Sequence, residues 1–236
     1  MNRRAIVAVL ALMGCGDPVA PPATPSATPA AIPPAVGSLL GTVRLAGIEI
    51  KPRHDLKYDD SLILGPGQVM ANVYVAVRSG LGDRRFSTAS NPVLLRHGGS
   101  LYEPRVVGLM TNQPLKVRNG DDKLHNVRIT SNFGRPFNIG LAKDSEEGLT
   151  FPKPEIGMPV MCDVHPWERA WIHVSDHPFF TVTGIDGKYS IKELPPGEYE
   201  ILTWHERFRD ASLVSKVKVE AGQTSTLDFK FEASRK

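Results

Sequence analysis

The residues of this chain best suited to chemistry are a cysteine and two histidines in its second half. Cys162 and His165 lie in the stretch Cys162-Asp163-Val164-His165-Pro166-Trp167, and His125 lies upstream, after the turn-forming stretch Asn119-Gly120-Asp121. Thiolates and imidazoles are side chains that bind transition metals such as zinc and copper. Each residue alone is usually structural, but the three in combination indicate a metal site.

The two stretches resemble the cupredoxin family of plastocyanin-like copper domains, over residues 101–174. In that family a histidine follows an Asn-x-Asp strand end, as His125 does here, and a Cys-x-x-His loop closes the site, as Cys162 and His165 do. The resemblance implies a β-sandwich that binds one copper ion through these three residues. A thiolate and two imidazoles form a trigonal set suited to copper, and a weaker axial donor tunes the reduction potential.

The chain departs from the family at the fourth ligand. Cupredoxins usually place an axial methionine shortly after the second histidine, and in relatives with His-Pro-Trp it follows the tryptophan directly; here that position is Glu168. A coordinating carboxylate is a harder donor that favours Cu(II) and lowers the reduction potential. If Glu168 faces solvent instead, the site has three ligands and an open position. Met158 and Met161 are other candidate donors, although Met161 should face away from Cys162 on its strand.

The resemblance also implies supporting roles for two asparagines. The backbone near Asn126 would donate a hydrogen bond to the sulfur of Cys162, and Asn119 would support the site from the end of its strand.

Other polar residues are weaker candidates. His173 and His177 are expected to be structural. Arg105 stands where related chains sometimes carry histidine, which argues against a second metal site there. The stretch Trp204-His205-Glu206 ends a predicted strand, and its sequence assigns it no role beyond packing between domains.

The elements that must position these residues are short strands. β-branched or alternating apolar runs, separated by Gly, Pro, Asn and Asp clusters, predict strands and no long helix. The chain is therefore expected to be all-β, with two Greek-key-type β-sandwiches. The predicted strands cover residues 39–45, 69–77, 115–117, 125–130, 160–162, 170–174, 179–182, 188–191, 199–204, 214–219 and 225–231.

A second resemblance concerns the C-terminal part. The stretch from Thr183 to Ile191, with a tight Asp186-Gly187 turn, and the stretch from Leu194 to Tyr199, with a Pro196-Gly197 type II turn, resemble the carboxypeptidase regulatory-like (transthyretin-like) β-sandwich. This sandwich normally begins with two strands similar to residues 41–43 and 71–75. We therefore predict a discontinuous regulatory-like domain, residues 38–81 and 178–232, with a cupredoxin-like domain, residues 82–177, inserted in it or packed on it. The alternative is that the early strands belong to the central domain.

The N-terminus predicts export. Arg3 and Arg4 precede a short apolar run, residues 5–13, and Leu12-Met13-Gly14-Cys15 resembles the bacterial lipobox. We expect a signal peptide over residues 1–14, lipid on Cys15 and a Pro/Ala-rich tether over residues 15–37. The alternatives are an ordinary signal peptide or a buried helix. The chain contains two cysteines, so a lipid on Cys15 leaves Cys162 as a lone thiol, which metal ligation would explain.

The predicted function is that of a copper protein anchored by lipid to a bacterial membrane, in the periplasm or on the outer surface. The first hypothesis is one-electron transfer with a redox protein. The second is copper storage, sensing or exchange with a copper donor or acceptor protein. The third is a metal-free scaffold. An enzyme is not expected, because the sequence shows no nucleophile triad, acid–base pair or phosphate loop. Nucleic acid is not an expected partner, because the net charge of +3 falls to +1 without Arg3 and Arg4.

Overall fold

The computed structural model describes residues 35–47, 61–134 and 136–233. The predicted signal peptide, the lipid on Cys15 and most of the tether lie outside the described residues. Among those that are described, no helix is long and apolar enough to cross a bilayer.

The described residues form β-strands and one short 3₁₀ helix, η1 (Glu206–Ala211), which confirms the all-β prediction. Alternation of buried and exposed side chains explains why these segments are strands. In β8 (Leu115–Asn119), for example, Leu115, Val117 and Asn119 are buried while Lys116 and Arg118 are exposed. Such a period of two buries one face of a sheet and leaves the other to solvent.

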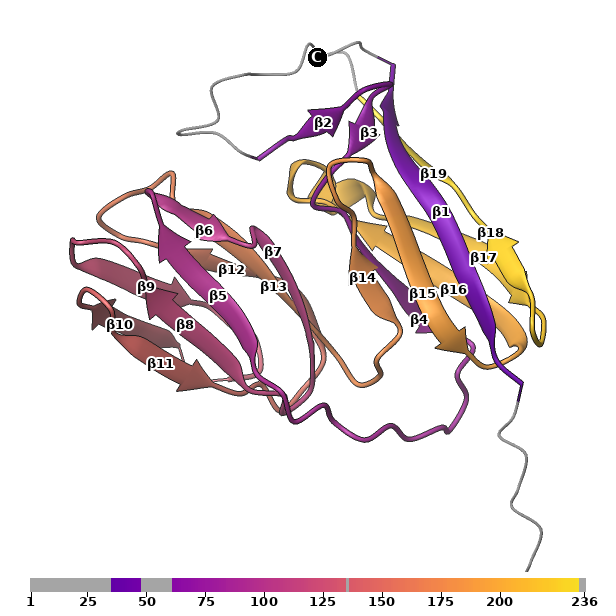
Figure 1. Ribbon diagram of the computed structural model, residues 1–236, viewed down its shortest axis with the longest axis horizontal. Coiled ribbons are helices and arrows are strands. Elements are labelled where there is room, and N and C mark those ends of the chain that lie inside the picture. Colours follow the sequence, from indigo (N-terminus) through magenta and orange to yellow (C-terminus); the bar gives the residue numbers. More distant parts are fainter. Residues whose placement is uncertain (1–34, 48–60, 135, 234–236) are drawn as a thin grey trace, which may run out of the picture. The chain divides into compact units, whose positions relative to one another are not determined.

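The central part of the chain folds into two sheets (Figure 1). One has the order β10-β9-β12-β13-β7 and the other β11-β8-β5-β6. Apolar residues of both sheets form one core cluster, which includes Leu95, Val117, Ile129 and Ile172. The remaining strands are β5 (Val93–Gly98), β6 (Leu101–Glu103), β7 (Val106–Met110), β9 (His125–Ile129), β10 (Phe137–Leu141), β11 (Glu146–Leu149), β12 (Glu155–Met161) and β13 (Arg169–Ser175).

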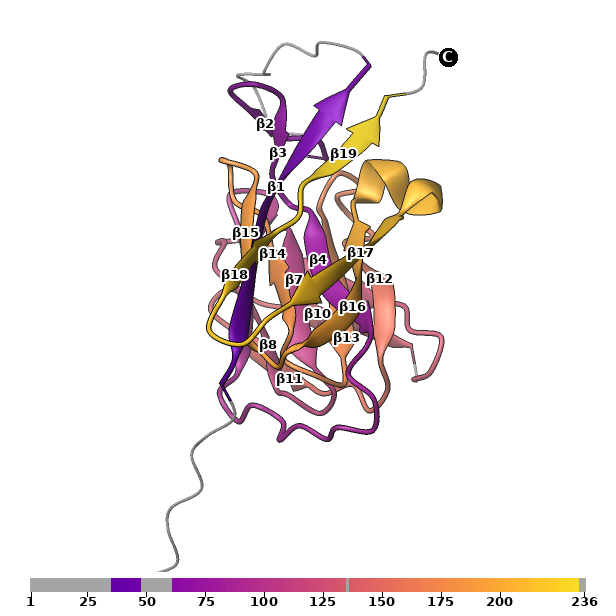
Figure 2. The ribbon, with the colours of Figure 1, turned by 90° about the vertical axis from the view of Figure 1, so that its right-hand side faces the viewer.

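The first and last parts of the chain fold together into two further sheets. β1 (Gly37–Ala46) pairs with β15, β18, β19 and β3, and β4 (Tyr74–Ser79) pairs with β14 and β16. Figure 2 shows β1 and β19 side by side. Strands before and after the central segment therefore share sheets and a core. The other strands are β2 (Leu64–Gly65), β3 (Val69–Met70), β14 (Phe180–Val182), β15 (Lys188–Leu194), β16 (Gly197–Trp204), β17 (Leu213–Val219), β18 (Thr224–Thr226) and β19 (Phe229–Glu232).

Three details of the predicted strands and turns are wrong. The strand predicted over residues 69–77 is broken between β3 and β4, where Asn72 has a φ of 59°. The strand predicted over residues 225–231 is divided because Asp228 turns its carboxylate to accept a hydrogen bond from the Thr42 N–H at 2.7 Å. Gly197 already belongs to β16 and is not among the positive-φ glycines, so the type II turn is absent there, whereas Gly187 has the expected φ of 65°.

β13 is buried on both faces, as is its neighbour β7 in the same sheet. Ala170, Ile172 and Val174 point into the central core. Trp171 and His173 point to the other side, where the indole of Trp171 lies 5.2 Å from that of Trp204 and His173 stacks on Tyr74 at 4.1 Å. A second packed layer thus joins the central sheets to the sheet that contains β4 and β16.

This contact layer gives the Trp204-His205-Glu206 stretch a role. Trp204 packs on Trp171, and the ring of His205 accepts a hydrogen bond from the Arg207 N–H at the start of η1. Glu206 forms a buried ion pair with Arg105, with Nη2 and Oε2 2.9 Å apart. Arg105 therefore lies in a salt bridge at this contact.

Candidate metal centre

The loop that carries Cys162, His165 and Glu168 closes the hairpin between β12 and β13. Met161 pairs with Arg169 at the ends of the two strands, so the loop spans residues 162–168. The Cys162 N–H donates to the Glu168 carbonyl at 3.3 Å, and the Glu168 N–H donates to the His165 carbonyl at 2.9 Å. These backbone bonds curl the loop so that side chains at intervals of three residues face the same side.

His125 reaches the same place as the first residue of β9, paired with Leu141 of β10. The loop before it is fixed by Asn119, which is fully buried. The Asn119 side-chain amide donates to the carbonyls of Lys123 at 2.7 Å and Leu141 at 2.8 Å, and its oxygen accepts from the Asp121 N–H at 2.9 Å. Asn119 thus holds in place the backbone that leads to His125.

Four donor atoms converge between these segments. One ligand atom each from His125, Cys162, His165 and Glu168 lies within 4.8 Å of every other. The Cys162 sulfur is 3.6 Å from Nδ1 of His165, Oε2 of Glu168 is 3.1 Å from Nδ1 of His125, and Oε1 of Glu168 is 3.3 Å from Nδ1 of His165. The structure brings together all four residues that the sequence proposed as ligands.

The donor set fits a copper ion. Ligand atoms that share an ion at roughly 2.0–2.3 Å lie about 3–4 Å apart. The three contacts given above, at 3.1, 3.3 and 3.6 Å, fall in this range. Glu168 is completely buried, and its Oε1 has no hydrogen-bond partner among the described residues. A buried carboxylate without full compensation is costly, and a cation supplies the missing interaction. A thiolate and two imidazoles with one further donor suit copper, although zinc accepts the same atoms.

Two further residues border the centre, and neither was predicted from the sequence to be a site residue. His97, on β5, is fully buried, and its Nε2 lies 2.8 Å from Oε2 of Glu168. Asp121 contacts both histidine rings, with Oδ2 3.3 Å from Nδ1 of His97 and 3.2 Å from Nε2 of His125. The centroids of the His97 and His125 rings are 3.7 Å apart.

The surroundings of the Asp121 carboxyl, at the border of the centre, keep it ionised. Burial alone would raise the pKa of the Asp121 carboxyl, but hydrogen bonds from the Gly99 and Ser100 N–H groups and the nearby histidines lower that pKa below its usual value. The pKa of His97 is lowered, chiefly by burial, which outweighs the opposing attraction of Glu168. Asp121 is therefore an anion that faces both imidazoles.

The supporting role proposed for Asn126 takes a different form from the one implied by the resemblance. Its side-chain oxygen accepts a hydrogen bond from the Asp163 N–H at 2.5 Å, and its amide donates to Asn138. Arg128 fixes Asp163 from the other side through an Nε–Oδ1 bond of 2.7 Å. No hydrogen bond joins the Asn126 backbone to the Cys162 sulfur in the described ranges, so Asn126 positions the ligand loop through Asp163.

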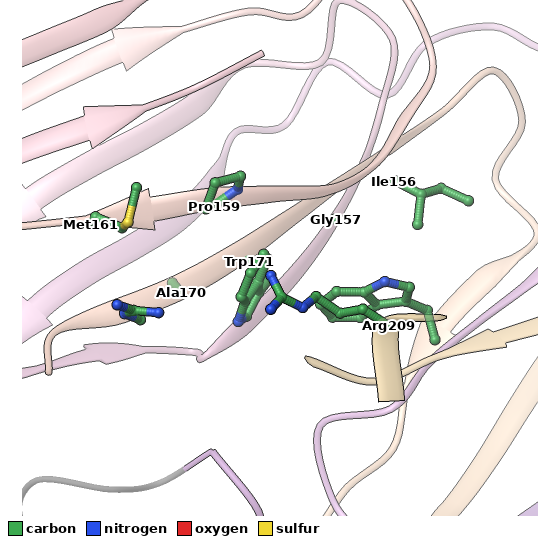
Figure 3. A pocket seen from close by; sticks show the side chains of 9 residues that line it. Ile156, Gly157, Pro159, Met161, Ala170, Trp171 and Arg209 are labelled. Carbon is green, nitrogen blue, oxygen red and sulfur yellow. The ribbon is translucent and has the colours of Figure 1, made fainter. Parts of the chain in front are cut away.

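Neither methionine near the loop contributes a donor. Met161 lines a pocket of about 420 Å³ with Pro159, Trp171 and Arg209 on the outer side of the hairpin (Figure 3). Its neighbour Cys162 points the other way, as the period of a strand requires. Met158 faces the core with Cys162, but four residues of strand separate them by about 13 Å. Glu168 is thus the fourth donor of the group.

One of the four candidate ligand residues reaches the surface. The side chain of His165 is 23% exposed, whereas the other three candidates are at most 2% exposed. Exposed apolar side chains lie in the same loop or in the loop before β9: Leu124, Val164 and Trp167 are 67%, 65% and 36% exposed. The His165 ring centroid is 5.3 Å from that of Trp167.

No protein-family model and no curated protein matches this chain. Solved structures similar to part of it are cupredoxins. A purple cupredoxin from Nitrosopumilus maritimus is 19% identical, with a TM-score of 0.31, and the match covers 36% of this chain and 98% of that one. Amicyanin from Paracoccus versutus is 19% identical, with a TM-score of 0.33, over 43% of this chain and 97% of that one.

A copper-containing nitrite reductase from Thermus scotoductus SA-01 is also similar, at 20% identity and a TM-score of 0.34. The match covers 42% of this chain but only 26% of the reductase. The prediction that the chain is not an enzyme is therefore corrected. The prediction relied on the lack of a nucleophile triad, acid–base pair or phosphate loop in the sequence, and catalysis that depends on copper needs none of these.

Proposed function

We propose that this chain binds one copper ion through His125, Cys162, His165 and Glu168 and exchanges single electrons with a redox protein. The observation that carries the proposal is the convergence of these four donor atoms, all within 4.8 Å of one another, in a buried centre. The predicted lipid anchor on Cys15 would place this exchange at a bacterial membrane, outside the cytoplasm.

The scaffold suits electron transfer because it restrains the donors. His125 belongs to a strand paired with β10, and the other three residues belong to a loop closed by its own backbone hydrogen bonds. Donors that cannot move far keep a similar arrangement around Cu(I) and Cu(II). A bound copper ion would supply the one-electron couple, and the protein's contribution is to limit the rearrangement that each transfer requires.

Electrons would enter and leave through His165. It is the ligand residue with substantial exposure, and its ring centroid lies 5.3 Å from that of the exposed Trp167. The apolar Val164 in the same loop and Leu124 in the loop before β9 are also exposed. Apolar groups exclude water from a transient contact without binding the partner tightly. We infer that a redox partner docks on this apolar patch.

Metal titration tests the proposal. In a Cys15→Ser background, Cys162 is the only thiol. The purified protein should bind one Cu(II) per chain and develop a strong thiolate-to-copper absorption band, and Cys162→Ser should abolish the band. Met161→Leu, which alters the adjacent residue on the opposite face, is the matched control and should leave the band unchanged. If Cu(II) produces no spectral change in the reduced protein, the proposal fails and a metal-free scaffold is favoured.

Glu168 favours a second candidate, copper storage or delivery. A carboxylate binds Cu(II) as a hard, charged donor, and the partly exposed His165 gives a chelator access to the ion. Rapid loss of copper to a chelator together with an irreversible couple in voltammetry would favour this candidate. Slow loss with a reversible couple would favour electron transfer.

A further inference from the structure

The two oxygens of Glu168 lie in different surroundings. Oε2 faces the two histidines of the β-sheets, 2.8 Å from Nε2 of His97 and 3.1 Å from Nδ1 of His125. Oε1 faces the loop, 3.3 Å from Nδ1 of His165, and has no hydrogen-bond partner in the part of the chain that is described. The carboxylate is therefore already divided into one occupied oxygen and one available oxygen.

His97 does not belong to the group of four converging donors, but with Asp121 and His125 it forms a second group of three whose ligand atoms also lie within 4.8 Å of one another. Its contact is with the carboxylate, and at 2.8 Å this contact has the length of a charge-assisted hydrogen bond. The ring nitrogens of His97 are buried and are not yet aligned with a hydrogen-bond partner, so a small rotation of ring or carboxylate is all that the bond requires. His97 is thus placed to act on the centre through Glu168.

The His97 ring is itself fixed from two sides. Its Nδ1 faces Oδ2 of Asp121 at 3.3 Å, and Asp121 is anchored by the Gly99 N–H at 2.7 Å and the Ser100 N–H at 3.3 Å. The Tyr102 ring packs edge-on against it, with centroids 4.8 Å apart. These contacts confine the ring and hold Nε2 2.8 Å from Oε2 of Glu168.

We propose that His97 is a positioning residue that occupies Oε2 of Glu168, so that Glu168 offers copper Oε1 alone. This inference rests on the proposed copper function and concerns how the fourth donor is presented. A carboxylate limited to one oxygen is a weaker donor to Cu(II) than one that offers both. His97 thereby raises the reduction potential relative to the same centre with an unrestrained carboxylate.

The test compares reduction potential and electron paramagnetic resonance in substitutions of His97. His97→Phe keeps a ring against Tyr102 but has no N–H, and His97→Leu serves if the phenylalanine variant does not fold. His97→Gln keeps an N–H for Oε2. Leu95→Val, which perturbs a buried residue of the same strand away from Glu168, is the matched control. Each substitution is also made together with Glu168→Gln.

We expect His97→Phe to bind one copper with its thiolate band intact, but with a lower reduction potential and a larger parallel hyperfine splitting. His97→Gln and Leu95→Val should resemble wild type. With Glu168→Gln present, His97→Phe should cause no further shift, because the two residues act through one group.

Three results would overturn the inference while leaving the copper function intact. They are an unchanged potential and spectrum in His97→Phe, an equal shift with Glu168→Gln present, and two copper ions per wild-type chain of which one depends on His97. A wild-type chain that binds no copper would overturn the proposed function and this inference together.

Discussion

Oε2 of Glu168 lies 3.1 Å from Nδ1 of His125, although the two residues are 43 positions apart in the chain. The carboxylate comes from a hairpin loop and the imidazole from the start of β9, and both side chains are buried. Their contact places a carboxylate at the position where the cupredoxin resemblance leads one to expect a methionine. The identity of this fourth donor distinguishes the centre from a cupredoxin site with an axial methionine.

Replacing Glu168 with methionine should convert the centre to ordinary blue-copper behaviour. A thioether is a soft, neutral donor that favours Cu(I), so Glu168→Met should raise the reduction potential and strengthen the visible thiolate band. Voltammetry and optical spectra measure both effects. If the spectra and the potential are unchanged, Glu168 does not bind copper.

Asp121 should control copper affinity without binding the ion. Its Oδ2 lies 3.2 Å from Nε2 of His125, the arrangement in which a carboxylate orients a ligand imidazole. Asp121→Asn is expected to weaken Cu(II) affinity by roughly 10–100-fold in a chelator competition assay. Asp122→Asn, one residue further along the loop and exposed, is the control and should retain wild-type affinity. Equal affinities in all three proteins would contradict the role of Asp121.

The Arg105–Glu206 pair should contribute to stability through the contact layer. Both side chains are at most 8% exposed, and removing one partner of such a pair leaves an uncompensated buried charge. Glu206→Gln should therefore reduce the free energy of unfolding by about 3–5 kcal/mol in chemical denaturation. In the exposed pair Arg96–Glu103, Glu103→Gln should cost less than about 1 kcal/mol. Comparable losses in the two variants would count against a buried, energetically coupled pair.

Acid should destabilise the copper-free protein through its buried histidines. Burial lowers the pKa of His173 to about 3, against about 6.5 in the unfolded chain. As the pH falls from about 6.5 towards 3, the unfolded state takes up a proton that the folded state does not, so the free energy of unfolding falls by up to about 1.4 kcal/mol per pH unit. Burial likewise lowers the pKa of His205 to about 3, so this histidine adds to the loss.

His173→Gln isolates the first of these groups. Its amide oxygen keeps an acceptor for the Gly157 N–H, which donates to Nδ1 of His173 at 3.3 Å, but it does not titrate. Denaturation at a series of pH values should show a shallower slope for this variant below pH 6.5 and the same slope as wild type above pH 7.5. Parallel slopes at all pH values would show that folding does not lower the pKa of His173.

The sequence was informative where function depends on local spacing. Cys162 and His165 were expected in one short loop, and the resemblance to cupredoxins put Glu168 at the position of the fourth donor. The structure brings the three side chains together. The alternation of apolar residues likewise predicted most strands near their observed bounds. The break at Asn72 was missed because a positive φ at a non-glycine residue leaves no mark on hydrophobic periodicity.

His97 was missed for a different reason. The strand that carries it, β5, was not predicted, and its burial depends on parallel pairing with β8, where His97 lies opposite Asn119. Parallel pairing joins segments that are distant in sequence and has no local signature. The signal that could have found it is the alternation of Leu95 and His97 as the buried positions of that strand.

Copper K-edge X-ray absorption of the copper-loaded protein tests the central claim most directly, because it counts the atoms bound to the ion. The account predicts one sulfur at bonding distance together with nitrogen and oxygen donors, with the sulfur lost in Cys162→Ser and a nitrogen lost in His125→Gln. A spectrum without a sulfur neighbour, or one that Cys162→Ser leaves unchanged, would contradict the account.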